Sequence, residues 1–281
     1  MPWSFKSSWH SFLLTPFIKL GRKMPTAAGL HYFLHEGGSP RRLPLVLIHG
    51  AGGDHLSWPP EVRRLPNQRV ITLDLPGHGK TDGPGCQSIE DYARRVVKAL
   101  DSSGFSRAVF AGHSMGGAIA LELALDYPDR VAGMVLISTG AWLPIPPSVI
   151  ENAANQSTFL LAVQRLQELS FGSQASPTLI EINFKRLAEI RQPLLLGDLV
   201  ACDRFNRTGH LGAIRCPALV VCGTEDKLTP LRFSEFLSSQ IPGAALQTLQ
   251  GAGHMLILEQ PDRLAKLIRV FLATIPFSPG M

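Results

Sequence analysis

Short, fully apolar runs alternate with helical patterns from residue 30 onward, and this alternation limits the possible folds more than any other feature of the chain. The apolar runs are typical of buried strands and occupy 43–50, 69–75, 107–113, 131–138, 218–223 and 245–250. Helical patterns occupy 88–104, 116–130 and 261–274, and Ser88 is the candidate N-cap of the first. Strands that are apolar throughout indicate a parallel sheet covered by helices on both faces, so the sequence predicts an α/β fold.

The alternation breaks between Ser138 and Leu219. Residues 141–212 lack strong strand signals, read mostly as helices, and open with a proline-rich stretch from Leu143 to Pro147. We therefore expect a core built from residues 24–140 and 213–281, and a helical cap of residues 141–212 that covers the site as a lid. A chain of 281 residues is long enough for one large α/β domain with such an insertion.

Composition excludes several classes of function. Hydrophobic residues make up 45% of the chain and charged residues 17%, which supports a sizeable core and excludes general disorder. The net charge is +5, but the basic residues cluster only as scattered Arg-Arg pairs, so no nucleic-acid partner is predicted. The four cysteines show no metal-ligand spacing and are Cys86, Cys202, Cys216 and Cys222. We expect free thiols, no metal and a reducing, cytoplasmic location.

The first 23 residues differ from the rest of the chain. They are rich in aromatic residues, and their apolar run from Phe12 to Leu14 is soon broken by Pro16. That run is much too short to span a membrane, and the segment lacks the features of a secretory signal. We expect an extension without stable structure, with Met24 as an alternative start. Contact with a membrane surface is the competing interpretation, and liposome sedimentation with and without residues 1–23 separates the two.

Residues 111–117 read AGHSMGG and place Ser114 between a predicted strand and a predicted helix. A G-x-S-x-G pattern in this position is typical of a nucleophile elbow, a turn so sharp that the serine hydroxyl projects above the sheet. Glycines two positions before and two after the serine leave room for crowded backbone. The competing interpretation is a plain glycine-rich turn, which leaves the strand before the motif and the helix after it unexplained. We predict that Ser114 is a nucleophile.

A serine hydroxyl needs a general base, and the base needs a carboxylate to orient it. His254 lies in the loop between the last predicted strand and the last helix, and it is the candidate base. Asp226 follows the strand at 218–223 and is the candidate carboxylate, with Glu225 beside it as a competing acid. The order Ser, Asp, His along the chain is the one expected of hydrolases built on such a sheet.

Acyl transfer also needs hydrogen-bond donors for the developing oxyanion. After the strand at 43–50 the chain turns through small residues, from Gly50 to Gly53, that let backbone N–H groups approach a substrate carbonyl. We assign the oxyanion hole to the N–H groups of Ala51 and Met115. His49 is interpreted as a structural histidine that ties loops together, and His78 is given no catalytic part.

Taken together, these motifs resemble the α/β-hydrolase superfamily. They are specific in combination and extend over residues 30–275, with HG-x-G at 49–52, DLPGHG at 74–79, GHSMGG at 112–117, G-x-x-D at 223–226 and GAGH at 251–254. The resemblance implies a mostly parallel, twisted sheet of eight strands with helices on both faces, a helical cap and no cofactor. It adds support for the roles of Ser114, Asp226 and His254.

Several members of that superfamily fit the sequence poorly. Epoxide hydrolases and haloalkane dehalogenases use an aspartate where this chain has Ser114, and the cap tyrosines of epoxide hydrolases have no counterpart in 141–212. Proline iminopeptidases usually carry tryptophan where Met115 stands. We expect a serine esterase of the carboxylesterase type that cleaves small to medium apolar esters. A carbon–carbon bond hydrolase with the same triad and a slow-hydrolysing small-molecule receptor are the alternatives, and a perhydrolase side activity fits the same elbow. The sequence carries no signal for an oligomeric state.

Apolar side chains are expected to line the acyl pocket. We predict that Trp58, Met115 and Trp142 contact the substrate. Further candidates lie in the cap and are Leu143, Ile145, Phe159, Leu160, Leu161, Phe171, Leu194, Leu195 and Leu196. The competing interpretation for each of these residues is that it packs the cap onto the core.

Overall fold

The computed structural model describes residues 26–39 and 42–276. The expected extension of residues 1–23 lies outside the described residues. Eight strands form one sheet in the order β1-β2-β4-β3-β5-β6-β7-β8. Their bounds are β1 (Thr26–Ala27), β2 (Leu30–His35), β3 (Leu45–Ile48), β4 (Val70–Leu73), β5 (Ala108–His113), β6 (Val131–Ile137), β7 (Ala218–Gly223) and β8 (Ala245–Leu249). Strand β2 pairs antiparallel with β1 and β4, and all other pairs are parallel, so the predicted mostly parallel sheet of eight strands is confirmed.

Helices connect the parallel strands. Their bounds are α1 (Pro60–Arg63), α2 (Ile89–Ser102), α3 (Met115–Asp126), α4 (Pro147–Ala154), α5 (Phe159–Ser170), α6 (Pro177–Ala188), α7 (Gln192–Arg204), α8 (Leu231–Gln240), α9 (Leu256–Glu259) and α10 (Pro261–Thr274). The side chain of Ser88 accepts a hydrogen bond from the Asp91 N–H at 3.1 Å, which confirms it as the N-cap of α2. This contact satisfies one of the free N–H groups at the start of the helix.

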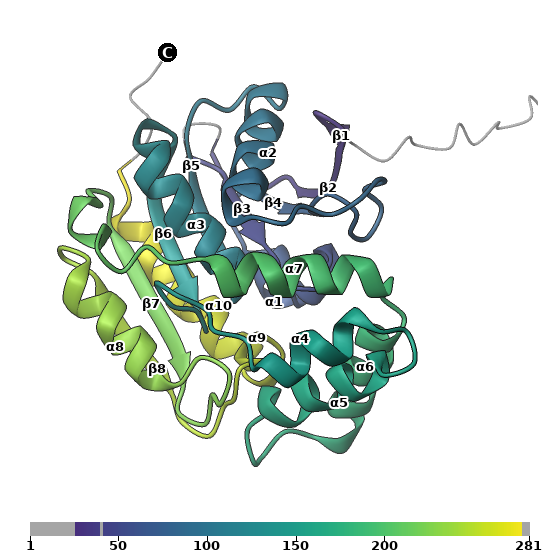
Figure 1. Ribbon diagram of the computed structural model, residues 1–281. Helices are drawn as coiled ribbons and strands as arrows, with labels where there is room; N and C mark the ends of the chain where they lie inside the picture. The colour runs from purple at the N-terminus through teal and green to yellow at the C-terminus, as the bar shows by residue number, and fades with distance from the viewer. Residues whose placement is uncertain (1–25, 40–41, 277–281) are drawn as a thin grey trace, which may run out of the picture.

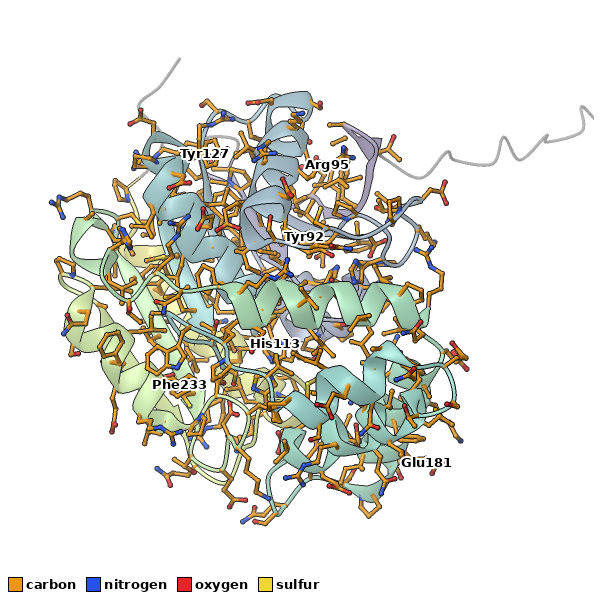
Figure 2. The ribbon with its side chains drawn as sticks, viewed as in Figure 1. Tyr92, Arg95, His113, Tyr127, Glu181 and Phe233 are labelled. Carbon is orange, nitrogen blue, oxygen red and sulfur yellow. The ribbon has the colours of Figure 1, made fainter. Side chains whose placement is uncertain are left out.

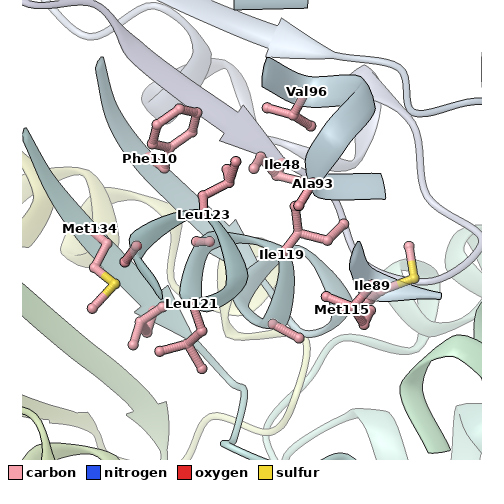
Figure 3. Close-up of a cluster of buried hydrophobic side chains, with 14 of the residues drawn as sticks. Ile48, Ile89, Ala93, Val96, Phe110, Met115, Ile119, Leu121, Leu123 and Met134 are labelled. Carbon is pink, nitrogen blue, oxygen red and sulfur yellow. The ribbon is translucent and has the colours of Figure 1, made fainter. Parts of the chain in front are cut away.

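Two apolar layers cover the sheet, one on each face (Figure 1). Successive strand residues point to opposite faces, so Val46 and Ile48 join the layer under α2, α3 and α8, while Leu45 and Leu47 join the layer under α1, α9 and α10. Helix α3 carries apolar residues on every side, with Glu122 as a buried exception, and is almost wholly buried, as Figure 3 shows for Ile119, Leu121 and Leu123. Each such side chain contributes about 1.5–3 kcal/mol by burial.

The antiparallel strand β2 is a feature that the sequence patterns did not predict. Its sequence, LHYFLH, mixes histidine and tyrosine with apolar residues and has no fully apolar run. Only its first two residues are buried, because β2 lies near the edge of the sheet and pairs antiparallel with β4. Antiparallel edge strands face the solvent on one side, and they therefore lack the apolar signature by which the parallel strands were found.

The segment 141–212 lies between β6 and β7 and contains α4, α5, α6 and α7 (Figure 1). We call it the insertion. Its two ends meet: Trp142 and Asn206 form an isolated antiparallel bridge, and the Arg207 N–H donates to the Ala141 carbonyl at 2.8 Å. Arg207 also pairs with the buried Glu122 of α3 at 2.5 Å. The insertion therefore leaves and rejoins the core at one place.

Within the described residues, no helix has both the length and the apolar character needed to cross a membrane. The four cysteines form no disulfide, as expected from their spacing.

Candidate active site

Ser114 lies between β5 and α3 with φ +54°, a backbone conformation that residues other than glycine rarely adopt. Strain of this kind persists only where the surroundings enforce it. A Cβ on Gly112 would lie 2.0 Å from the Gly116 carbonyl oxygen, and a Cβ on Gly116 would lie 2.1 Å from the carbonyl oxygen of Ile48. Both contacts are impossible for a real side chain, so the two glycines are required for the turn that holds Ser114.

Asp226 and His254 follow β7 and β8, two neighbouring parallel strands, and their side chains meet. His254 Nδ1 lies 3.0 Å from Asp226 Oδ2 and 3.2 Å from Oδ1. A carboxylate only accepts hydrogen bonds, so Nδ1 carries the proton and Nε2 is left free to accept one. Asp226 is itself fixed, because Oδ1 accepts the N–H groups of Leu228 and Thr229 and Oδ2 accepts the Thr229 hydroxyl.

The Asp226 carboxyl is held in its charged form. Burial alone would raise its pKa, but the neighbouring His254 and the hydrogen bonds from Thr229 outweigh burial and lower the pKa below its usual range. A charged carboxylate beside Nδ1 stabilises the imidazolium that forms when His254 takes a proton.

Glu225, the competing acid, points elsewhere. Its side chain is only half-buried and accepts hydrogen bonds from the N–H and the hydroxyl of Ser173, at 2.6 and 3.0 Å. Of the two neighbouring carboxylates, only that of Asp226 contacts the imidazole of His254.

Ser114 and His254 line one cavity. No hydrogen bond joins these two described side chains, and such contacts often tighten only when substrate binds. The loop that carries His254 is held from two sides. The His254 carbonyl accepts a hydrogen bond from His113 Nε2 at 2.9 Å. The Met255 N–H donates to the carbonyl of Ser170, at the end of α5, also at 2.9 Å. Burial lowers the pKa of His113 to about 3, so its ring is neutral and serves as a fixed donor at neutral pH.

The two residues predicted to supply oxyanion donors lie beside Ser114. Ala51 lines the cavity, and a Cβ on the preceding Gly50 would lie 3.2 Å from the Cβ of Ser114, so this loop lies directly against the elbow. Met115 is the first residue of α3, where the N–H groups of a helix lack partners within the helix. Among the residues that the structure describes, neither the Ala51 nor the Met115 N–H donates a hydrogen bond.

The cavity has a volume of about 140 Å³ and is mostly apolar. Its apolar lining comes from both the core and the insertion and consists of Leu143, Pro144, Ile145, Leu166, Leu187, Leu195, Leu199, Leu228, Met255 and Leu258. Of the cap residues expected to line it, Leu143, Ile145 and Leu195 do so. The remaining candidates do not line it, and Leu160 and Leu161 are exposed to solvent, at 56% and 53%.

The three predicted substrate contacts, Trp58, Met115 and Trp142, do not line this cavity. Trp58 is fully buried in the layer under α1 and α10. The Met115 side chain turns into the opposite core layer, as Figure 3 shows, although its N–H remains at the elbow. Trp142 stacks on Phe233 of α8 with ring centroids 4.3 Å apart. These three large side chains therefore serve packing and do not contact the cavity.

His49 joins two loops, as expected. Its Nδ1 donates to the Gly50 carbonyl at 2.8 Å, and its Nε2 accepts the Leu75 N–H at 3.1 Å. Burial lowers its pKa to about 4, so the ring is neutral at pH 7. His78 binds Asp198 of α7, at 2.8 Å. Asp198 is the residue near the site that sequence patterns missed, since an aspartate in a predicted helix reads as a surface residue.

One cluster has the composition of a metal site. The ligand atoms of His31, His55 and Asp74 lie within 4.8 Å of one another and are buried. The Asp74 carboxylate, however, already accepts Nδ1 of both histidines and the N–H groups of His55 and Lys80. Its oxygens are occupied by these donors, and the cluster ties β2 and the loop at 54–58 to the end of β4. The residues therefore fit a structural hydrogen-bond network better than a metal site.

Comparisons with known proteins agree with this geometry. A family model for the alpha/beta hydrolase fold matches residues 44–261. The acetyltransferase component of an acetoin cleaving system from Pseudomonas putida is 33% identical over 84% of this chain, which spans 64% of that protein. The 2-hydroxymuconate semialdehyde hydrolase of Pseudomonas putida is 30% identical over 91% of this chain and 95% of its own. The structure of a thermophilic esterase superposes with a TM-score of 0.75 at 32% identity, covering 88% of this chain and 95% of that one. The chain belongs to the alpha/beta hydrolase fold family.

Proposed function

We propose that this chain hydrolyses small to medium apolar carboxylic esters through an acyl-enzyme formed on Ser114. The observation that carries the proposal is the meeting of three parts at one cavity. Ser114 sits in a strained turn, His254 is oriented by a charged Asp226, and the residues beside the serine, Ala51 and Met115, have N–H groups without partners among the described residues. This arrangement contains a nucleophile, a base with its orienting group, and donors for an oxyanion, which are the requirements of acyl transfer.

The reaction runs in two halves. The Ser114 hydroxyl attacks the ester carbonyl while its proton passes to His254 Nε2, and the N–H groups of Ala51 and Met115 bind the resulting oxyanion. His254 then gives the proton to the departing alcohol, leaving an acyl-enzyme. A water molecule loses a proton to the same nitrogen and attacks the acyl carbonyl. Collapse of the second oxyanion releases the acid and returns the proton to Ser114.

The cavity sets the size of the acyl group. Its volume of about 140 Å³ is close to that of an engineered apolar cavity of roughly 150 Å³ that binds benzene. We therefore expect the fastest turnover with acyl chains of roughly four to six carbons. The apolar lining favours an uncharged chain, and the polar side chains of Asn183 and Arg186 lie at the part of the cavity formed by α6.

Hydrolysis of p-nitrophenyl esters from acetate to palmitate, with wild type beside Ser114→Ala, tests the proposal. We expect serine-dependent turnover with an optimum at short to medium chains and a loss on the order of 10⁴- to 10⁶-fold in Ser114→Ala. Near-native turnover in that variant would remove Ser114 from the mechanism. Little turnover on every ester by a folded wild type would favour the carbon–carbon bond hydrolase or the ligand receptor.

A second candidate is hydrolysis of a carbon–carbon bond by the same triad. It is favoured by the 30% identity, over nearly the whole chain, to a 2-hydroxymuconate semialdehyde hydrolase, and by Asn183 and Arg186, which could bind a polar group of the substrate. Loss of the ultraviolet absorbance of 2-hydroxymuconate semialdehyde, compared at equal enzyme concentration with ester hydrolysis, decides between the two. A kcat/KM for the semialdehyde well above that for every ester would favour this candidate.

The free thiols agree with a reducing compartment, and we propose a cytoplasmic location. Fractionation of cells that express the chain at its natural level checks this, and recovery in a membrane fraction would contradict it.

A further inference from the structure

Asp198 on α7 is a buried carboxylate that the proposed reaction does not use. Its side chain is fully buried and accepts three hydrogen bonds from the core. Oδ2 accepts the Gly52 N–H and His78 Nε2, each at 2.8 Å, and Oδ1 accepts the Tyr92 hydroxyl at 2.5 Å. Tyr92 belongs to α2 and lies beside α7 in Figure 2. One side chain of the insertion thus joins three separate segments of the core.

The charge of Asp198 is balanced by His78. Nδ1 of His78 lies 3.0 Å from the Pro76 carbonyl and Nε2 lies 2.8 Å from the carboxylate, so both ring nitrogens face acceptors. Burial would lower the pKa of His78, but the carboxylate of Asp198 outweighs burial and raises it. A buried ion pair with every polar atom bonded is costly to disturb, because removal of one partner leaves the other charge uncompensated.

Gly52 is the point where this network reaches the oxyanion loop. The Gly53 N–H donates to the Gly50 carbonyl at 3.0 Å, which closes a four-residue turn with Ala51 and Gly52 at its centre. Gly52 has φ +64°, as the third position of a type II turn requires. Its N–H belongs to the peptide that joins the two central residues, and Asp198 accepts that N–H. The orientation of the central peptide therefore depends on the carboxylate.

The insertion also packs directly against this glycine. A Cβ on Gly52 would lie 2.7 Å from Ile190 Cδ1, 3.0 Å from Leu187 Cδ1 and 3.2 Å from Leu195 Cδ1. These side chains cover the turn, and they leave it no space to change conformation without moving α6 or α7.

We propose that Asp198 is a positioning residue for the oxyanion hole: by accepting the Gly52 N–H, it holds the turn at 50–53 in the conformation that presents the Ala51 N–H to the substrate. The proposal rests on the proposed function, since it concerns the oxyanion of that reaction. It gives the insertion a part in catalysis beyond lining the cavity. A purely structural contact between α7 and the core would affect stability alone. A positioning role would also affect kcat, so the two roles can be separated by kinetics.

Asp198→Ala is the test, because alanine removes every acceptor from the Gly52 N–H. Asparagine is unsuitable, since its amide oxygen at the place of Oδ2 still accepts the Gly52 N–H. We expect kcat for p-nitrophenyl butyrate to fall by about 10- to 100-fold, less than the loss of a whole oxyanion donor, with KM within about threefold. Inhibition by butylboronic acid, whose serine adduct places an oxygen in the oxyanion hole, should weaken by a similar factor.

Glu181→Ala is the matched control. Glu181 lies on α6 of the same insertion, is exposed, and pairs with Lys185 of its own helix at 2.6 Å. We expect this variant to keep kcat and the boronate inhibition constant within about twofold. Equal losses in the two variants would mean that any loss of a carboxylate from the insertion disturbs the enzyme, and the proposal would fail.

Ser114→Ala in the same series separates this proposal from the proposed function. If Ser114→Ala abolishes turnover while Asp198→Ala melts at a lower temperature but keeps kcat and boronate binding, only the positioning role is wrong. If Ser114→Ala keeps turnover, the proposed function itself is wrong. Should Asp198→Ala not fold, Tyr92→Phe decides: it removes the bond to Oδ1 that helps to fix the carboxylate, and we expect a roughly three- to tenfold lower kcat at unchanged KM. A wild-type kcat in Tyr92→Phe would then overturn the proposal.

Discussion

Replacing Asp226 by asparagine should inactivate the enzyme while leaving its fold intact. Oδ1 of Asp226 accepts two backbone N–H groups, from Leu228 and Thr229, so the amide oxygen of the substituted side chain must take that place. The amide NH₂ then replaces Oδ2 and faces His254 Nδ1, which is 3.0 Å away. Because an NH₂ group only donates, Nδ1 must give up its proton and become an acceptor. The proton moves to Nε2, the nitrogen that has to receive the proton of Ser114.

The expected size of the effect follows from that exchange of tautomers. The same substitution in a serine protease triad lowers kcat about 10⁴-fold with unchanged geometry, which corresponds to about 5 kcal/mol of transition-state stabilisation. The hydrogen bonds to Asp226 here are the same in kind, so we expect kcat to fall by roughly 10³- to 10⁴-fold. KM should change little, because Asp226 does not line the cavity.

The loss of kcat is measured by the hydrolysis of p-nitrophenyl butyrate in a stopped assay over pH 6 to 10, with Glu225→Gln as the matched control. Glu225 is the adjacent carboxylate, but it bonds Ser173 and makes no contact with His254, so its variant should keep kcat within about twofold. A loss below about tenfold in Asp226→Asn would refute the reasoning, because the imidazole would then not depend on this carboxylate for its tautomer. A larger loss in Glu225→Gln than in Asp226→Asn would transfer the orienting role to Glu225.

Two further predictions concern the fold around the site. Gly116→Ala should destabilise the protein by more than about 3 kcal/mol or abolish folding, because the added Cβ would lie 2.1 Å from a backbone oxygen. The control Gly212→Ala, whose Cβ would have nothing within 4 Å, should change the free energy of unfolding by less than about 0.5 kcal/mol. Equal urea midpoints for the two variants would contradict this. Stability should also fall as pH drops from about 6.5 towards 4: the pKa values of the buried His49 and His113 are lowered to about 4 and about 3, so the unfolded chain binds more protons in that range. Urea unfolding at pH 7, 6 and 5 measures the effect, and a His113→Asn variant whose stability falls as steeply as that of wild type would contradict it.

The parts of the fold and site that sequence predicted are those set by local patterns. The buried parallel strands have no polar face, so their apolar runs identify them without knowledge of their neighbours. The elbow is similarly local, since the glycines that make room for Ser114 lie two positions away on either side. Asp226 and His254 each follow a strand, and parallel strands bring their carboxyl ends to one edge of the sheet.

The parts that sequence missed depend on contacts between distant segments. Asp198 bonds Gly52, His78 and Tyr92 across 146, 120 and 106 residues of sequence, and nothing near it marks the position. The assignment of pocket residues failed for a related reason. Trp58 and Trp142 are close to the site along the chain. Packing against α10 and α8, respectively, turns their side chains towards the core, and the local sequence does not show this.

The bridge between Trp142 and Asn206 has a consequence for how such a chain can be re-engineered. Because both ends of the insertion are fastened side by side, by this bridge and by the bond from Arg207 to Ala141, the helices between them could be exchanged as a cassette without stretching the sheet. A chimera made in this way would inherit a new acyl pocket together with the old nucleophile. It would also lose the acceptor for the Gly52 N–H unless the donor cassette carried its own carboxylate at the position of Asp198. Grafting for specificity and grafting for rate are therefore separate design problems in this scaffold.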